Sequence, residues 1–472
     1  MRISIDPWLR GAVLLTGVGL LCKALIASQL GVLADEAYYW TWSSEPALGY
    51  FDQPPMIAWI LNLVTSGAGD SALALRGASI CSAIFGWYAL RRYAGRQDLW
   101  AAWWLLAPPL CWLTLFATPD AYLLAFWAGA LAGALRGGRG WWAAGLCIGL
   151  AGLTKYSGCM LLPLLFVAAP ADERRVAALR MLIPATILWL PHLGWLWEYQ
   201  GVSVGYAFEE GLGHARPPGL FGPIEQLAEQ ALVWTPLVFL VGLRWLHNAR
   251  PWAHQEVGCP TRVRRVAWWT SAPVIVFFWL ASMFGPPEAH WPAPAWVGIG
   301  LALSHTPSRH LRSLWTGLWL GGIVSALALM HALQPLTSAP WSPYPRVQEG
   351  NVLAQALTPW VMPIGALPHT FPSETPPVVW TERYQEASLL RYHLGLNAWV
   401  TPGCGRPTQF GLWPTPDGLD SAKSAWFLRP TTSGEPTCTT ELGTLRTRHL
   451  VHGRTPDGEV HGKWDLWEVS AD

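Results

Sequence analysis

The stretch that decides the fold is Asp35–Trp40, with the sequence DEAYYW, followed closely by Gly49–Pro55, with the sequence GYFDQPP. It comes directly after the first long apolar segment, where that segment would leave a membrane. Adjacent carboxylates, aromatic rings and a double proline therefore meet at a membrane boundary. A carboxylate at such a depth becomes neutral, pairs with a cation or takes part in chemistry. We expect a functional loop at this place.

The composition predicts a polytopic membrane protein. Of 472 residues, 52% are hydrophobic and only 13% are charged, whereas about 25% are charged in soluble domains. The 33 Trp residues suit the bilayer interface, where an apolar ring and a polar N–H are both satisfied. A net charge of +1 excludes the strongly basic face of a nucleic-acid-binding protein.

The apolar runs give about eleven candidate spanning helices, each near the roughly 20 residues that a bilayer requires. They cover residues 9–33, 71–90, 99–117, 119–135, 141–153, 155–170, 178–198, 224–246, 266–284, 291–304 and 312–334. The shorter apolar run 55–67 predicts an interfacial or re-entrant helix. We interpret the first helix as an uncleaved span, because its apolar run is too long for a signal peptide.

Basic residues fall in alternate loops, and this pattern predicts the orientation. Arg residues gather at 91–96, 136–139, 174–180, 244–265 and 309–312, whereas 34–70 contains no Lys or Arg. By the positive-inside rule the N-terminus lies in the cytoplasm and the chain after about residue 335 lies outside. The polar clusters then all fall on the outer side: Asp35–Glu36, Asp52, Thr118–Asp120, Thr154–Tyr156, His192, Glu198, Glu209–Glu210 and Glu288–Trp291. We infer one site that opens outward.

The last part of the chain, 335–472, changes in character. Pro- and Thr-rich connectors alternate with short apolar segments, which predicts a small soluble α/β or mostly-β domain. Residues 337–350 are expected to form a linker, so the predicted domains are a transmembrane domain, 1–334, and an outer domain, 335–472. A disulfide between Cys404 and Cys438 fits only a region outside the cytoplasm.

Asp35, Glu36 and Asp120 are the candidate catalytic carboxylates. A carboxylate at the mouth of an apolar cavity can take a proton from a hydroxyl, as a general base must. The alternative for Asp35 and Glu36 is a solvated loop. Asp120 follows Thr118 at a predicted helix start, where Thr118 would cap the helix and Asp120 would suit its positive end; the alternative is a second acid facing the first.

Lys155 and Arg76 are the candidate cations of the outer side. An intramembrane cation usually has an anionic partner, so Lys155 is expected to pair with Asp35 or Asp120, or to hold a substrate phosphate. Arg76 could share that phosphate. For both residues the alternative is a side chain that extends to the lipid headgroups.

Two further motifs carry weaker signals. Glu288 and His290 stand two residues apart, and with Glu36 or Asp52 they could hold a divalent metal. His192, on the seventh predicted span, is expected to be a satisfied interior histidine instead of a ligand. The segment Glu382–Glu386, with Arg383 and Tyr384, predicts a helix start; the alternative is that it only anchors the outer domain.

Five motifs together resemble the bacterial glycosyltransferase family 39 proteins, the group of dolichyl-phosphate-mannose protein mannosyltransferases and of aminoarabinose transferases that modify lipid A. They are the opening stretch, Thr118–Asp120, Thr154–Tyr156, HWPAPA at 290–295 and RYQEA at 383–387, and 405–413 is also similar. The resemblance implies a GT-C fold, a polyprenyl-phosphate sugar donor and inverting transfer on the periplasmic face of the bacterial inner membrane. It implies Asp35 as catalytic base or as the acid that orients the acceptor, Glu36 beside it, Asp120 as second acid and Lys155 as phosphate contact. Many relatives have His or Lys at the position of Gln53, and a neutral amide cannot supply that charge, so Lys155, Arg76 or Arg383 would have to.

We therefore expect a membrane glycosyltransferase that moves one sugar to lipid A, another envelope glycan or a protein. Substrate contacts are expected from a set of outer-side residues: Lys155, Arg76, Tyr38, Tyr39, Asp52, His290, Arg383 and Tyr384. No cofactor other than the possible divalent metal is implied. The main alternative is a transporter or flippase of a lipid-linked sugar, which should show polar clusters on both faces or inverted repeats. A second alternative is a ligase that transfers a whole glycan chain, which would share the lipid donor. A third is a receptor-like scaffold, which would not need the outer carboxylates.

Overall fold

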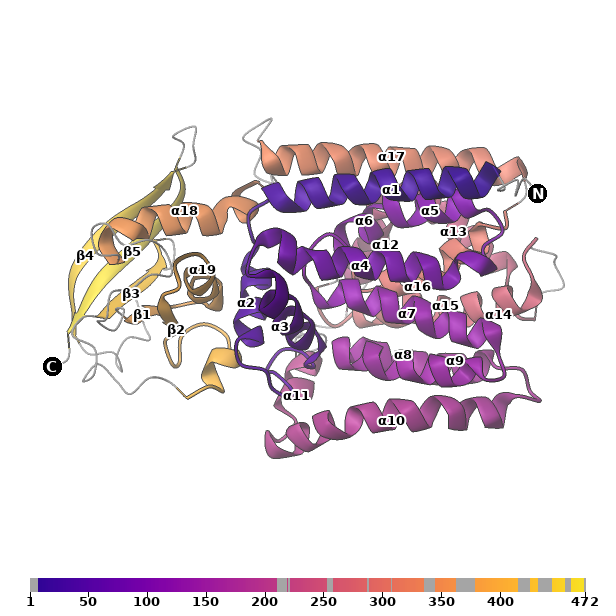
Figure 1. The fold of residues 1–472 in the computed structure, drawn as a ribbon, viewed down its shortest axis with the longest axis horizontal. Helices are drawn as coiled ribbons and strands as arrows, with labels where there is room; N and C mark the ends of the chain where they lie inside the picture. The colour runs from indigo at the N-terminus through magenta and orange to yellow at the C-terminus, as the bar shows by residue number, and fades with distance from the viewer. Residues whose placement is uncertain are drawn as a thin grey trace.

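The apolar runs of the first 334 residues form a bundle of helices in the computed structural model of the protein (Figure 1). The structure describes residues 7–209, 219, 221–252, 258–286, 288–306, 308–334, 344–361, 378–414, 425–431, 444–454 and 460–470. The helices of the bundle are α1 (Pro7–Gln29), α2 (Ala34–Ser43), α3 (Met56–Ala68), α4 (Ala72–Leu90), α5 (Gln97–Leu106), α6 (Pro108–Leu113), α7 (Pro119–Arg136), α8 (Gly140–Thr154), α9 (Leu161–Ala168), α10 (Arg174–Glu198), α11 (Val202–Phe208), α12 (Phe221–Val233), α13 (Pro236–Asn248), α14 (Thr261–Trp269), α15 (Ala272–Ala281), α16 (Ala293–Leu303) and α17 (Ser308–Leu333).

Several predicted spans are broken. The run 99–117 divides into α5 and α6 where Pro108 begins a new helix, and 266–284 divides into α14 and α15. Helices α12 and α13 are bent by 114°, and α1 and α2 by 87°. By length and composition three described helices can cross a membrane, or up to five if each bent pair is one span. The number of eleven spans therefore stays a prediction.

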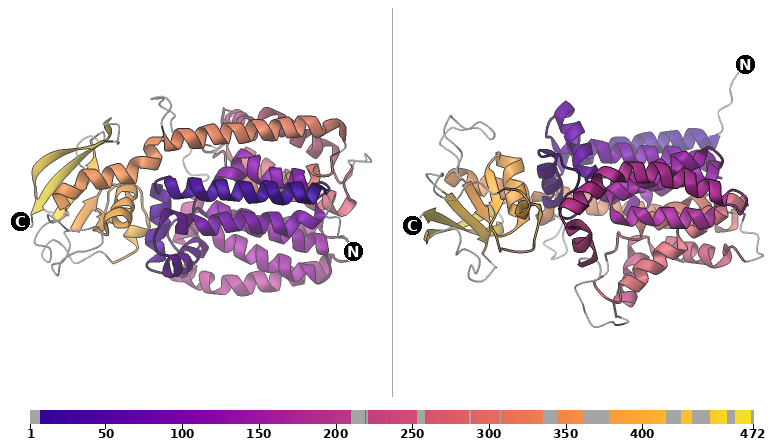
Figure 2. Two further views of the ribbon diagram at one scale, coloured as in Figure 1. Left: turned by 45° about the horizontal axis from the view of Figure 1, so that its top comes forward. Right: turned by 90° about the horizontal axis from the view of Figure 1, so that it is seen from below.

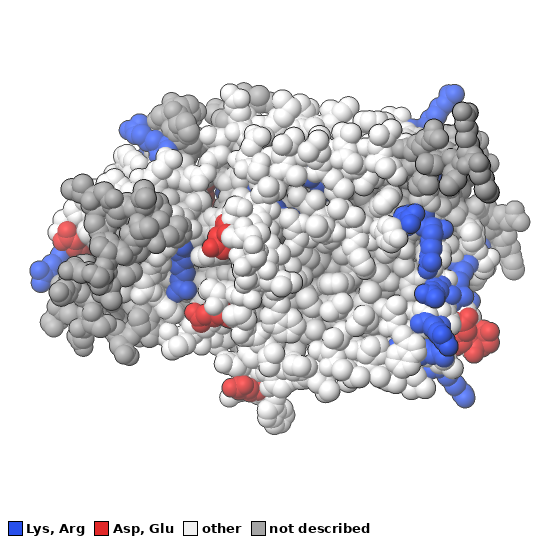
Figure 3. Space-filling view, in the orientation of Figure 1, with Lys and Arg blue, Asp and Glu red and all other residues white. Residues whose placement is uncertain are grey.

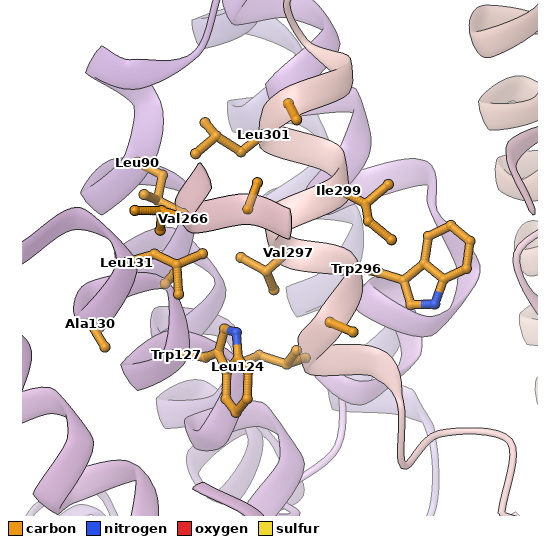
Figure 4. Packing of buried hydrophobic residues seen from close by; sticks show 14 of the residues in the cluster. Leu90, Leu124, Trp127, Ala130, Leu131, Val266, Trp296, Val297, Ile299 and Leu301 are labelled. Atoms are coloured by element: carbon orange, nitrogen blue, oxygen red, sulfur yellow. The ribbon is translucent and has the colours of Figure 1, made fainter. Parts of the chain in front are cut away.

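Tryptophan fills the centre of the bundle. Trp234 stacks on Trp296 with ring centroids 4.5 Å apart and on Trp103 at 5.8 Å, and all three rings are buried. Small residues allow close helix contacts: a Cβ on Gly133 of α7 would lie 2.6 Å from the backbone nitrogen of Ala144 of α8. Figure 4 shows the same close packing between α7 and α16. Much of the unusual tryptophan content thus builds the core.

After α17 the chain forms a five-stranded sheet at one end of the bundle (Figures 1 and 2). The strands are β1 (Val378–Thr381), β2 (Asn397–Val400), β3 (Ala425–Pro430), β4 (Thr444–Arg454) and β5 (Val460–Ser470), in the order β2-β1-β3-β5-β4. β1 is parallel to β2 and β3, whereas β5 is antiparallel to β3 and β4. Helix α19 (Tyr384–Leu394) connects β1 to β2, as a parallel pair requires. The division at 334/335 itself stays a prediction.

One detail differs from the sequence expectations, and a second lies partly outside the described residues. Helix α18 (Tyr344–Val361) begins inside the predicted linker 337–350, so that its second half is helical; residues 335–343 lie outside the described residues. Apolar residues of α18 such as Leu353 and Leu357 are buried with the sheet, and this burial favours a helix there. Cys404 is disulfide-bonded, whereas Cys438 lies outside the described residues.

Charge is distributed unevenly along the bundle. Figure 3 shows Lys and Arg side chains gathered at the end of the bundle that faces away from the sheet. Helices α2 and α3 lie at the other end, next to the sheet and α19 (Figure 1). The candidate site residues of α2 therefore lie between the bundle and the C-terminal region.

Candidate active site

Glu36 and Arg76 form a buried ion pair that fixes the start of α2. The Nη2 of Arg76 lies 2.6 Å from Oε2 of Glu36, and both side chains are 0% exposed. The other donors of Arg76 reach Oε1 of Glu36 and the carbonyl oxygens of Ala27, Leu30 and Gly31. Because each of its five N–H donors has a protein partner, Arg76 joins the end of α1 to α2 and is directed away from solvent.

The same carboxylate also holds the backbone. Oε2 of Glu36 accepts a hydrogen bond from the Leu33 N–H at 3.0 Å, and Oε1 accepts one from the Ala117 N–H at 2.8 Å. The first of these bonds caps α2, because Leu33 is its N-cap residue. Asp35 is thereby placed on the exposed side of a fixed first turn. The two adjacent carboxylates, Asp35 and Glu36, have different surroundings.

The C-terminal region docks on α2 through hydrogen bonds. Tyr384, the first residue of α19, donates its hydroxyl to Oδ1 of Asp35 at 2.9 Å. The hydroxyl of Tyr38 accepts a bond from the Gln409 N–H at 2.7 Å, and the Phe51 N–H donates to the side-chain oxygen of Gln409 at 2.8 Å. Residues far apart in sequence thus form one surface around Asp35.

Arg406 brings a cation to the outer loop. Its Nη2 lies 3.0 Å from Oδ2 of Asp52, and its guanidinium lies 4.6 Å from the ring of Tyr384 and 5.1 Å from that of Tyr206. Burial raises the pKa of Asp52 to about 6, and Arg406 opposes this effect. The carboxylate and the guanidinium therefore form a pair whose strength depends on pH.

A second cluster lies at the start of α7. The Nζ of Lys155 lies 3.0 Å from Oδ1 and 3.2 Å from Oδ2 of Asp120, which confirms the pairing of Lys155 with Asp120. The Nε2 of His290 lies 3.7 Å from Oδ2 of Asp120, and its Nδ1 lies 3.7 Å from Oε2 of Glu288. Burial lowers the pKa of His290, while Asp120 acts in the opposite direction. His290 thus joins the predicted pair.

Tyr39 connects the two clusters. Its hydroxyl interacts electrostatically with Asp35, Asp52 and Tyr384 on one side and with Asp120 on the other. The carboxylates of α2, of the following loop and of α7 therefore belong to one region at the end of the bundle. One site that opens outward stays a prediction.

The structure also describes three more residues that the sequence singled out: Thr118, His192 and Arg383. Thr118 is the N-cap residue of α7, as predicted. Its buried hydroxyl makes no hydrogen bond among the described residues, so the prediction that its side chain caps the helix is wrong. His192 is satisfied as expected, because it contacts the Leu48 carbonyl at 2.8 Å and the Tyr156 hydroxyl at 3.2 Å. Arg383 pairs with Glu386 of its own helix start.

The geometry does not gather the ligands of the possible metal site. Glu36 is bound to Arg76 and Asp52 to Arg406, so neither is free to join Glu288 and His290. Across the described ranges, no group of three His, Cys, Asp or Glu side chains is arranged to hold a metal ion. The site residues that the sequence did not single out are Arg406 and Gln409; both lie in the segment 405–413 that carries part of the resemblance.

Comparisons with known proteins show what the chain is similar to. The model of the family "Dolichyl-phosphate-mannose-protein mannosyltransferase" matches residues 52–195, which include Asp52, Asp120 and Lys155. A relative, the lipid A galacturonosyltransferase RgtD of Rhizobium johnstonii, is 28% identical over 323 residues, 64% of this chain and 66% of that protein. The chain is thus similar to a family of mannosyltransferases over part of its length, and to a galacturonosyltransferase.

Solved structures identify the fold of the chain. ArnT from Cupriavidus metallidurans in the apo state superposes with a TM-score of 0.62 at 14% identity, over 97% of both chains. The same protein bound to undecaprenyl phosphate gives a TM-score of 0.61 at the same identity and coverage. The chain therefore has the GT-C fold, as the sequence resemblance implied. Its match to RgtD spans slightly under two thirds of that relative's length.

Proposed function

We propose that this protein is a glycosyltransferase of family 39, which transfers a single sugar from a polyprenyl-phosphate donor to an acceptor at the outer face of the membrane. The observation that carries the proposal is the convergence of Asp35, Asp52 and Asp120, each with its own partner, at one end of an apolar bundle. Cations for a phosphate and an exposed carboxylate for a proton are the groups that such a displacement needs.

Asp35 is the proposed base. It is the exposed carboxylate of the pair, and the Tyr384 hydroxyl holds one of its oxygens at 2.9 Å. An acceptor hydroxyl would attack the anomeric carbon while the bond from that carbon to the phosphate oxygen breaks. The electron pair of that bond stays with polyprenyl phosphate, and the hydroxyl proton moves to Asp35. Inversion at the anomeric carbon follows from a single displacement.

Glu36 and Arg76 are proposed as positioning residues. Because every N–H of Arg76 is used inside the protein, the guanidinium has no donor left for a phosphate. This pair instead fixes the first turn of α2, from which Asp35 extends. The predicted catalytic role of Glu36 and the phosphate role of Arg76 are thereby replaced by one structural role in the proposal.

Lys155 and Arg406 are the proposed phosphate-side cations. Each is held on a carboxylate, Asp120 or Asp52, and each keeps part of its surface exposed, 18% for Lys155 and 36% for Arg406. Arg406 pairs with the residue directly before Gln53, the position at which many relatives have a cation. We propose that Arg406 supplies this charge, and that Tyr38, Tyr39, His290, Arg383 and Tyr384 complete the substrate surface.

The comparisons support the substrate classes. One relative is named a lipid A galacturonosyltransferase, and ArnT was crystallised with undecaprenyl phosphate. We propose lipid A or a related envelope glycan as acceptor, with the site and the C-terminal region facing the periplasm. The basic end of the bundle supports this orientation, because Lys and Arg favour the cytoplasmic side.

The deciding experiment uses the full-length protein in lipid nanodiscs. Polyprenyl-phosphate sugars, a galacturonic acid donor among them, are supplied with lipid A, and the acceptor is analysed by mass spectrometry. We expect a gain of one sugar mass, with transfer abolished in Asp35→Asn. The control is Glu45→Gln, an exposed carboxylate beyond the other end of α2, which should retain activity.

Two results would overturn the proposal. Near-normal turnover by folded Asp35→Asn would remove the base. Movement of the lipid-linked sugar across the bilayer without transfer to any lipid, glycan or protein acceptor would favour a flippase instead.

A further inference from the structure

Helix α12 presents a buried polar stripe that the proposed chemistry does not use. Glu225, Gln226, Glu229 and Gln230 follow one another at the spacing that places side chains on one side of a helix. Gln226 is 3% exposed and Gln230 is 4% exposed. The stripe occurs in a helix of an otherwise apolar bundle, where polar side chains are rare and usually functional.

Each of these four side chains has a polar atom without a partner. Oε2 of Glu225, Nε2 of Gln226, Oε2 of Glu229 and Oε1 of Gln230 are buried and make no hydrogen bond within the described part of the chain. Burying a polar group without a hydrogen bond is unfavourable. Four such atoms on one side of one helix indicate a missing ligand.

The stripe adjoins the candidate active site. Nε2 of Gln230 donates to the carbonyl oxygen of Ala289 at 2.7 Å, and Glu229 interacts electrostatically with Glu288. His290 directly follows Ala289 in the loop before α16, and its ring faces Asp120. Gln226 lies one turn before Gln230 on the same side of α12, so its free amide is directed along the same surface.

Exposed apolar side chains also lie on α12. Phe221 is 71% exposed, Ile224 64% and Leu232 78%. Phe221 lies one turn before Glu225, and Leu232 lies one turn after Glu229, so both flank the stripe. Trp234, at the end of α12, anchors the helix by stacking on Trp103 and Trp296. The helix thus offers hydrocarbon contacts beside hydrogen-bonding groups, a combination that suits an amphipathic ligand.

We propose that α12 binds the acceptor as a membrane-anchored glycolipid, with hydroxyl groups of its saccharide on the stripe and its acyl chains against the exposed apolar side chains. Carboxylate oxygens only accept hydrogen bonds, and sugar hydroxyls donate them. The stripe offers no cation to the donor phosphate, which is held instead by Lys155 and Arg406. This inference rests on the proposed function and specifies the acceptor as a lipid instead of a protein.

Binding measurements on the full-length protein test this directly. Native mass spectrometry is performed with lipid A and, separately, with undecaprenyl phosphate, on wild type and on Glu225→Ala/Glu229→Ala. The double variant should bind lipid A at least about tenfold more weakly, as expected for losing a charged hydrogen bond. Its binding of undecaprenyl phosphate should be unchanged. Gln226→Leu keeps the side-chain volume and should weaken lipid A binding in the same direction.

The control is Asp172→Ala, which removes an exposed carboxylate just before the start of α10 and should leave both affinities unchanged. Unchanged lipid A binding by the double variant overturns the inference, and so does an equal loss of undecaprenyl phosphate. A wild-type protein that binds no lipid A and glycosylates only proteins overturns it as well. If lipid A binds through the stripe but receives no sugar, the proposed transfer fails while the glycolipid site stands.

Discussion

Arg406 donates a hydrogen bond to Asp52 over 3.0 Å, although 354 positions separate the two residues in the sequence. The outer loop 34–70 contains no Lys or Arg of its own. The C-terminal region thus provides the cation at this loop, and the guanidinium is held between the rings of Tyr206 and Tyr384. The C-terminal region is therefore part of the candidate site.

Replacing Arg406 should separate the effect of its charge from that of its shape. Arg406→Gln removes the cation, and we expect transfer to fall by about a hundredfold, as when one donor to a developing anion is lost. Arg406→Lys keeps a point charge but not the planar fork, so it should retain intermediate activity. Initial rates with a polyprenyl-phosphate sugar measure both. Arg446→Gln, at an exposed position on β4, is the control and should match wild type.

The pair should also produce an acidic limb in the pH profile. The pKa of Asp52 is raised by burial to about 6. Below that pH the side chain is neutral and holds Arg406 less firmly, so transfer should decline as the pH falls through about 6. In Asp52→Asn this limb should be absent. A limb of the same midpoint in the variant would assign it to another group.

Through Asp52, a falling pH should affect stability in the opposite direction from its effect on transfer. Its folded pKa lies above the ordinary value of 3.8, so between about pH 4 and 6 the folded protein binds more protons than the unfolded chain. The contribution of Asp52 to stability is therefore present at low pH and is lost as the pH rises through about 6. Thermal unfolding at pH 4.5 and 7 should show a smaller change with pH in Asp52→Asn than in wild type.

The sequence predicted many of the helical runs and offered Asp120 as one of the possible partners of Lys155, because apolar length and local motifs carry that information. It did not reveal that Arg406 meets Asp52, since a contact across 354 positions depends on how the C-terminal region docks. Without the family resemblance, the residues alone did not distinguish Glu36 from Asp35. Two adjacent carboxylates look alike in a sequence, and only burial against Arg76 separates their roles.

Glu36 and Arg76 should matter mainly for folding. Both are fully buried, and removing one partner of a buried ion pair leaves an uncompensated charge. We expect Glu36→Gln to lower the free energy of unfolding by about 3 to 5 kcal/mol, and Glu36→Leu/Arg76→Met to cost less than Glu36→Gln. Thermal unfolding of the detergent-solubilised protein measures this. The partly exposed pair Arg96–Asp98 is the control, and Asp98→Asn should cost less than Glu36→Gln.

Tyr384 should act through both its hydroxyl and its ring. Burial and the Asp35 carboxylate raise the pKa of Tyr384, so its hydroxyl stays protonated and continues to donate to Asp35. Tyr384→Phe removes this donor but keeps the ring that lies 4.6 Å from the Arg406 guanidinium. Its kcat should fall by about tenfold, the effect of one lost hydrogen bond to a charged group, with KM for the donor unchanged.

Tyr384→Leu also removes the ring, so that it should additionally raise KM for the polyprenyl-phosphate donor, because Arg406 loses a cation–π contact. The matched control is Tyr392→Phe on the same helix, whose hydroxyl contacts the backbone carbonyl of Asp70 instead of Asp35. Equal kinetics for Tyr384→Phe and Tyr384→Leu would show that the ring does not support Arg406. A Tyr384→Phe enzyme with wild-type kcat would show that Asp35 is oriented by α2 alone, through the Glu36–Arg76 pair.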